Sequence, residues 1–105
     1  MKDTKFTPGT WRIMKHVSTG IESCNGRFVC TSGSYTDQTE KTNIENEYNA
    51  LLIASAPELL EALQDANELL KHLLLAIPEG NVSKTVRNCM TINEHAINKA
   101  LNQSK

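Results

Sequence analysis

The sequence predicts an α+β fold, in which a small three-stranded antiparallel meander packs on a C-terminal helical hairpin preceded by a short proline-broken helix. Three observations predict this class. The first third alternates short β-prone runs with turn residues, the second half carries leucine and alanine at helical spacing, and Pro57 interrupts that helical half once. With 105 residues, the chain is expected to form a single domain, residues 1–105.

The N-terminal third predicts an extended arm and three strands. Residues 1–9 are polar and end in Thr7-Pro8-Gly9, which is typical of an extended segment closed by a turn. Residues 10–31 are expected to form the meander, because Gly20 and Asn25-Gly26 separate its β-prone runs. The expected strands lie near residues 10–17, 20–24 and 27–31.

The Asn25-Gly26 pair is typical of a two-residue type I′ turn and sets the expected register of the last two strands. Side chains alternate between the two faces of a strand. The register therefore predicts one face that meets the helices, since a meander of this size is not stable alone. That face should carry Ile21, Ser23, Phe28 and Cys30.

A polar, hydroxyl-rich stretch at residues 32–41 follows the meander and contains one aromatic residue, Tyr35. It is longer than a simple connection requires. Two interpretations are open: a mobile surface loop, or a binding loop whose order depends on a ligand or partner.

Residues 42–101 are the expected helical part. Thr42 and Ser55 are each followed three residues later by glutamate, the spacing of a capping box at the start of a helix. Because Pro57 is tolerated in the first turn of a helix, one helix should end just before Ser55 and another should begin there. The expected helices lie near residues 42–54, 55–77 and 83–101.

Two apolar stripes run along the central helical part. The first follows alternating steps of three and four, the pattern of a coiled-coil seam. It consists of Leu52, Ala56, Leu59, Leu63, Ala66, Leu70, Leu73 and Ile77. The second consists of Leu60, Leu69 and Leu74. Because one stripe suffices to cover the small sheet and the last helix, the second predicts a homo-oligomer interface, in a dimer or a higher assembly.

Composition and charge argue against several classes of function. The formal net charge of −1 gives no reason to expect nonspecific binding to nucleic acid or to anionic membranes. No apolar run approaches the about 18 residues that a membrane span needs, and no signal peptide opens the chain. Three cysteines, an odd number, argue against a disulfide framework and predict a reducing, cytoplasmic setting.

No group of residues has the sequence pattern of a catalytic or metal site. His16, His72 and His95 do not converge in sequence with a carboxylate or thiol. Ser55 lacks the flanking glycines of a nucleophile elbow, and the cysteines lack the paired spacing of a zinc site. The sequence therefore predicts a protein that is not an enzyme and that has no catalytic residue, metal ligand or cofactor.

Five residues in and near the predicted meander could instead bind an anionic ligand: Trp11, Arg12, Arg27, Tyr35 and Lys41. Arginine, aromatic and hydroxyl groups together suit a phosphorylated nucleotide or another small anion. The alternative is that Trp11 anchors the core and that the charged groups are only exposed to solvent.

Three phrases of the sequence form a recognisable pattern. The chain opens with Thr7-Pro8-Gly9-Thr10-Trp11, continues through NALLIASAPELLEAL at residues 49–63, and closes with AINKA at residues 96–100. This pattern resembles small phage and prophage proteins of unassigned role, over nearly the whole chain. Those proteins usually carry a second proline where this chain has Thr10. The resemblance implies a viral origin, the fold described above and a bacterial host cell, but it carries over no catalytic residues.

Two hypotheses for function follow. In the first, a phage-encoded, non-enzymatic binding protein antagonises host antiviral defence, for example by sequestering a nucleotide-type signal in a homo-oligomer. In the alternative, the protein is an inhibitor or regulator that docks a host factor through its leucine-rich helical surface. A DNA-associated regulator is disfavoured, because the chain lacks a basic recognition helix.

Overall fold

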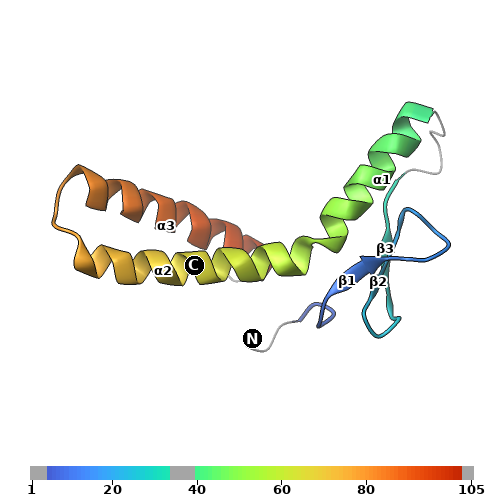
Figure 1. Ribbon diagram of the computed structural model, residues 1–105, viewed down its shortest axis with the longest axis horizontal. Coiled ribbons are helices and arrows are strands. Elements are labelled where there is room, and N and C mark those ends of the chain that lie inside the picture. The colour runs from blue at the N-terminus through green and yellow to red at the C-terminus, as the bar shows by residue number, and fades with distance from the viewer. Residues whose placement is uncertain (1–4, 34–39, 103–105) are drawn as a thin grey trace. The chain divides into compact units, whose positions relative to one another are not determined.

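A three-stranded sheet followed by three helices forms the part of the chain that the computed structural model describes, residues 5–33 and 40–102 (Figure 1). The strands are β1 (Trp11–Ile13), β2 (Gly20–Ser23) and β3 (Phe28–Thr31). The helices are α1 (Glu40–Ala54), α2 (Ala56–Ala76) and α3 (Asn81–Ala100). The expected α+β class is confirmed. The chain divides into two compact units, Met1–Glu58 and Leu59–Lys105.

In the first unit the strands are shorter than expected, but they pair antiparallel in the order β1-β2-β3. Arg12 lies opposite Glu22 in the β1–β2 pair. β1 ends early because the chain turns away after it: the Met14 N–H donates to the Gly20 carbonyl (2.9 Å), and the Gly20 N–H donates to the Val17 carbonyl (2.9 Å).

Four residues, Cys24 to Arg27, separate β2 from β3. Hydrogen bonds between Ser23 and Arg27 close a turn over three of them, Cys24, Asn25 and Gly26, so the expected two-residue turn is wrong. The Ser23 N–H donates to the Arg27 carbonyl (2.8 Å), and the Gly26 N–H donates to the Ser23 carbonyl (2.9 Å). Gly26 has a φ of 83°, a conformation that costs glycine little, and it ends a three-residue hairpin loop. The buried Ser23 hydroxyl favours this loop, because it accepts the N–H groups of Asn25 (3.3 Å) and Arg27 (3.2 Å).

A register shift in the β2–β3 pair moves Phe28 away from the face where it was expected. Ile21 lies opposite Cys30, as expected, but Glu22 lies opposite Phe28, so β3 carries one extra residue here. The Phe28 side chain is 59% exposed, and Val29 packs against the core instead. A β-bulge explains the error, because one extra residue changes which side chains beyond it share a face.

The core of the first unit lies where α1 contacts β1 and β2. Ile21, Ala50 and Ala54 are buried there. Five partly buried residues pack against them: Trp11, Ile13, Val29, Cys30 and Ile53. The Ser32 Oγ–H donates to the Asn46 carbonyl (2.9 Å) and ties the end of β3 to α1. Small side chains on α1 thus meet the one large side chain of β2 that is fully buried.

The break between α1 and α2 is at Ser55, as expected, but the hydroxyl has another role. The Ser55 Oγ–H donates to the Leu51 carbonyl (2.9 Å), so it continues the hydrogen bonding of α1 rather than capping α2. Thr42 lies inside α1, which begins at Glu40, and so it is not the expected N-cap. Pro57 lies in the first turn of α2, where its missing N–H has no helical partner to lose.

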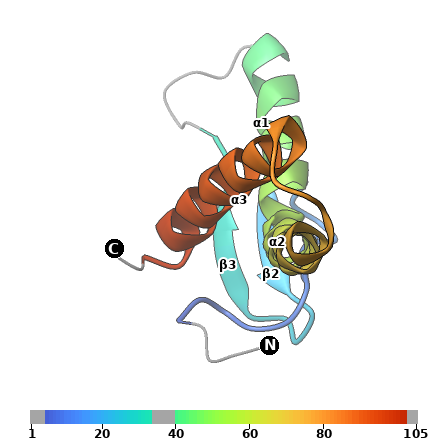
Figure 2. The same cartoon turned by 90° about the vertical axis from the view of Figure 1, so that its left-hand side faces the viewer.

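In the second unit, α3 doubles back beside α2 (Figures 1 and 2). The start of α3 is stabilised by Ser83, whose hydroxyl accepts the Gly80 N–H (2.9 Å) and lies 2.9 Å from the Gly80 carbonyl. An exposed ion pair between Glu79 and Arg87 (2.6 Å) joins the loop before α3 to the first turns of that helix. The hydrogen bond and positive charge of Arg87 hold the pKa of the Glu79 carboxyl below its usual value.

Within the second unit, the residues of α2 that are buried or half-buried define a seam. They are Leu60, Leu63, Gln64, Asn67, Leu70 and Leu74, and Ile77 continues them beyond the helix. The first expected stripe is therefore wrong in part, because Leu59 and Leu73 are exposed. The physical reason is Asn67, a polar residue that the apolar pattern passes over. Its Oδ1 accepts a hydrogen bond from Asn93 Nδ2 (3.3 Å), so the buried amide is satisfied.

Candidate functional site

Trp11, the first of the five proposed ligand contacts, is part of the core of the first unit. Its side chain is half-buried and packs against the cluster around Ile21. The indole Nε1–H donates to the Thr7 carbonyl (3.0 Å), and the Phe6 ring meets the indole edge-on at 6.2 Å. The indole is therefore held by the protein itself and anchors the N-terminal arm to the sheet.

Arg12 is already paired within the sheet. Its Nε lies 2.9 Å from the Glu22 carboxylate, directly across the β1–β2 pair. Arg12 is largely exposed, whereas Glu22 is more buried. The carboxylate offsets the guanidinium charge, so this arginine presents little net charge to an anion.

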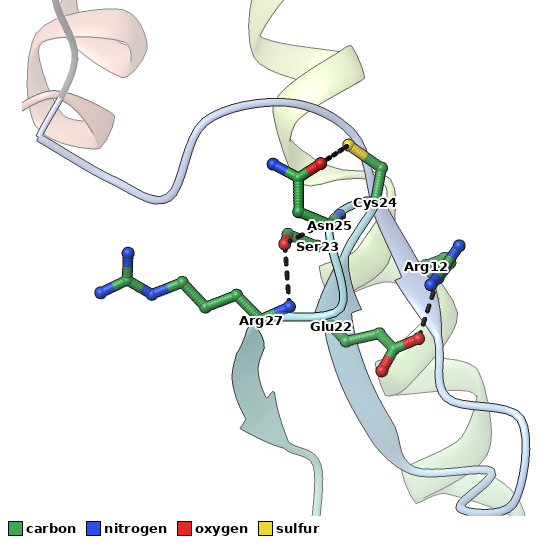
Figure 3. Close-up of polar contacts among 6 residues, drawn as sticks. All are labelled: Arg12, Glu22, Ser23, Cys24, Asn25 and Arg27. Carbon is green, nitrogen blue, oxygen red and sulfur yellow. Dashed lines mark hydrogen bonds and ion pairs between the residues drawn. The ribbon is translucent and has the colours of Figure 1, made fainter.

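Arg27 has a different environment from Arg12. Its backbone is held in the hairpin loop by Ser23, and its side chain extends away from the Arg12–Glu22 pair (Figure 3). Within the described residues no carboxylate pairs with its guanidinium. The structure therefore does not bring the two arginines together, and Arg27 is the more available cation.

The remaining two proposed contacts cannot be added to this surface. Tyr35 lies outside the described residues, and Lys41 is in α1 with its side chain outside them. Among the described members, Trp11 is in the core, Arg12 is paired and Arg27 points elsewhere. The described residues thus form no shared anion pocket.

A second surface was not predicted from the sequence: an apolar stripe on α1. It consists of Ile44, Tyr48, Leu51 and Leu52, all of which are exposed. The opposite side of α1, with Ala50 and Ala54, covers the sheet. The signal was available, because these four residues follow helical spacing. It was missed because Leu52 was assigned to the first stripe of the helical part, and Ile44, Tyr48 and Leu51 to no stripe.

The three expected interface residues have different environments on α2. Leu69 is exposed, whereas Leu60 and Leu74 are half-buried in the α2 seam. By helical spacing, Leu69 lies on the same side of α2 as Leu59 and Leu73, which are also exposed.

Comparison with known proteins places the chain in a phage family. The family model of Salmonella phage P22 protein Y8K6 matches residues 1–104. This chain belongs to that family. The resemblance to small phage-encoded proteins is thus confirmed at the level of the family. No curated protein and no solved structure matches the chain.

Within residues 5–33 and 40–102, no cluster of histidine, cysteine, aspartate or glutamate is arranged to hold a metal ion. None of the helices in that part of this P22 Y8K6 family member is long and apolar enough to cross a membrane.

Proposed function

We propose that this member of the phage family is a non-enzymatic binding protein that antagonises host antiviral defence by docking a host protein through α1. The phage family supports the biological setting. The exposed apolar stripe of α1 carries the proposal, because an apolar patch on a small protein is the usual mark of an interaction surface.

The stripe has the form of a helix that fits into a groove. Ile44, Tyr48 and Leu51 recur at steps of four and three on one side of α1, with Leu52 beside them. Grooves that bind amphipathic helices contact apolar side chains that recur at this spacing. Tyr48 is 68% exposed, and tyrosine is, with tryptophan and arginine, one of the residue types enriched among those that dominate binding at an interface.

Charge beside the stripe indicates the chemistry of the partner. Glu45 and Glu47 are exposed on the two flanks of the stripe. Glu47 also accepts a hydrogen bond from the Ser18 hydroxyl (3.2 Å), which holds its carboxylate beside the loop between β1 and β2. We therefore expect an apolar groove with a basic rim, since complementary rim charge speeds association and suppresses wrong partners.

The test replaces Tyr48 by glutamate in the full chain. The change is expected to weaken capture of the host protein at least about tenfold, because it would bury an unpaired charge. Capture from host lysate is measured together with the plating efficiency of phage on a defence-carrying host. The matched control is Asn43→Glu, which adds the same charge to the same helix away from the stripe.

The expected pattern is that Tyr48→Glu loses both capture and plating, whereas Asn43→Glu keeps both. If Tyr48→Glu retains full capture and full protection of the phage, docking through α1 is wrong.

The second candidate is sequestration of a nucleotide-type signal in a homo-oligomer. The observation that favours it is Arg27, which is exposed and has no carboxylate partner among the described residues. If Arg27 binds a phosphate, Arg27→Ala should cost about 1.5–3 kcal/mol of binding free energy. Calorimetry with cyclic and linear nucleotides measures it, with Arg12→Ala as a control because Arg12 is already paired. If no nucleotide in the panel gives a heat of binding, this candidate is excluded.

A further inference from the structure

The second unit exposes an apolar surface on one side of the α2–α3 hairpin. Five large side chains belong to it: Leu59, Leu69, Leu73, Val82 and Ile92. Four smaller exposed residues lie between them: Ala62, Ala66, Cys89 and Ala96. These nine residues are called the hairpin face below. It contains no charged group.

Both helices contribute to the same side of the hairpin. On α2, each member comes one residue before the seam, as with Leu69 before Leu70. On α3, each member again comes one residue before a less exposed position, as with Ile92 before Asn93. One residue turns an α-helix by about 100°. Because α2 and α3 are antiparallel, the same offset in each helix puts both stripes on one side of the hairpin.

The opposite side of the hairpin is polar. It is formed by residues that come one position after a buried or half-buried one: Glu61, Glu68, Lys71, Leu75, Lys84, Arg87, Thr91, Glu94 and Asn98. Leu75 is the exception, at 87% exposure. Glu68 and Lys71 form an ion pair there (3.3 Å). The hairpin thus has one side suited to water and one suited to a second apolar layer.

The interior of the hairpin is small. Val86 is the only apolar side chain of the described second unit that is buried, and the other buried side chains are Asn67 and Ser83. A helical domain is stable when each apolar stripe is covered by another layer. The hairpin face lacks such a layer.

We propose that a second copy of this chain covers the hairpin face, so that two hairpins form a four-helix bundle. The face is uncharged, so two copies meet without like-charge repulsion. Its area is also sufficient. Two helices about 30 Å long and about 10 Å apart present roughly 30 by 20 Å, which is about 600 Å² per partner and about 1,200 Å² for both, the lower end of the range for specific interfaces. The α1 stripe is less suited to self-association, because its acidic flanks would repel each other.

The distribution of side-chain size sets the orientation of the two copies. The three alanines, Ala62, Ala66 and Ala96, lie toward the open end of the hairpin together with one large member, Leu59, whereas Leu73 and Val82 lie toward the loop between α2 and α3. Leu69 and Ile92 are near the middle, within one helical turn of the Asn67–Asn93 hydrogen bond. With the loops at opposite ends, the bulky half of each copy meets the alanine half of the other, which allows interdigitated packing.

This interface is independent of the proposed docking of a host protein, which uses α1. The first test is the mass of the wild-type full chain by sedimentation equilibrium at high micromolar concentration. Twice the chain mass is expected. A monomeric mass would overturn the proposal and would assign the hairpin face to another occupant.

The second test compares two glutamate substitutions in α2. Leu69→Glu should raise the dimer dissociation constant at least about a hundredfold, because two-fold symmetry buries the new charge twice. Leu75→Glu is the matched control on the polar side and should leave the constant within about threefold. Circular dichroism checks that both variants remain helical. An unchanged constant in a folded Leu69→Glu protein, or equal loss in both variants, would overturn the proposal.

The third test concerns orientation. Spin labels are placed at Asn81→Cys, beside the loop, in a chain whose native cysteines are replaced by serine or alanine. Loops at opposite ends should give a distance of about 30 Å or more, the length of α2. A dimer with labels closer than about 20 Å would overturn the opposite orientation.

Discussion

Replacing Ile21 by alanine is expected to lower the free energy of unfolding by about 2–5 kcal/mol, the range for removing a large aliphatic side chain from a core. Ile21 is fully buried and is the largest such side chain among the described residues. It meets Ala50 and Ala54 of α1, whose small side chains have no methylene groups that could fill the cavity. Urea denaturation followed by circular dichroism measures the change.

The control for this substitution is Ile44→Ala. It removes the same atoms from a half-exposed position on the outer side of α1. We expect a change within about 0.5 kcal/mol, as for most surface substitutions. Equal losses for Ile21→Ala and Ile44→Ala would show that the core of the first unit is not where the structure places it.

The second large effect is expected at Trp11. Trp11→Ala should cost about 3 kcal/mol, at the lower end of the range for an aromatic core residue because the indole is only half-buried. The substitution also loses the edge-on contact with Phe6 and the hydrogen bond to Thr7. Unfolding monitored by circular dichroism measures it, since the variant has no tryptophan fluorescence.

Trp11→Phe is the milder companion substitution. It keeps one six-membered ring in the core but loses the Nε1–H donor and the remainder of the indole, so a cost above the about 0.5–1.5 kcal/mol of the hydrogen bond alone, but below that of Trp11→Ala, is expected. If Trp11→Ala were as stable as wild type, the indole would be free for a ligand, and its role as an anchor would be wrong.

Patterns among residues that are close in sequence predicted most of the secondary structure. The glycine punctuation of the meander and the leucine spacing around Pro57 depend on neighbours in sequence, so strand order and helix positions could be read directly. The helices at α1, α2 and α3 begin and end within about two residues of the expected bounds, the ordinary uncertainty of helix ends. The hairpin loop and the register could not be read in this way. They depend on the buried Ser23 hydroxyl and on a bulge, which are tertiary features.

The seam of α2 shows the same limit for helix packing. An apolar pattern assigns polar residues to the surface, and so it excluded Asn67. In the folded protein Asn67 has a partner, Asn93, that lies 26 residues away in sequence. A buried polar pair of this kind aligns two helices, because any other register leaves an amide unsatisfied. The pairing becomes visible only when α3 is placed beside α2.

The candidate site was the least predictable part. Residue types that suit an anion were present in the meander, but their use depends on pairing across strands. Arg12 lies opposite Glu22 only because of the β1–β2 register, and that register also directs Trp11 toward the core. Composition showed which groups were available. Geometry showed which of them were already bound by the protein.

The position of the first core along the chain has a consequence for synthesis on the ribosome. The sheet supplies Ile21 early, but Ala50 and Ala54 emerge only after about thirty more residues have been made. A meander without its covering helix is unstable in water. The nascent β region therefore stays unfolded until α1 leaves the exit tunnel. By contrast, α2 and α3 are neighbours in sequence and can pair as soon as both have left the tunnel.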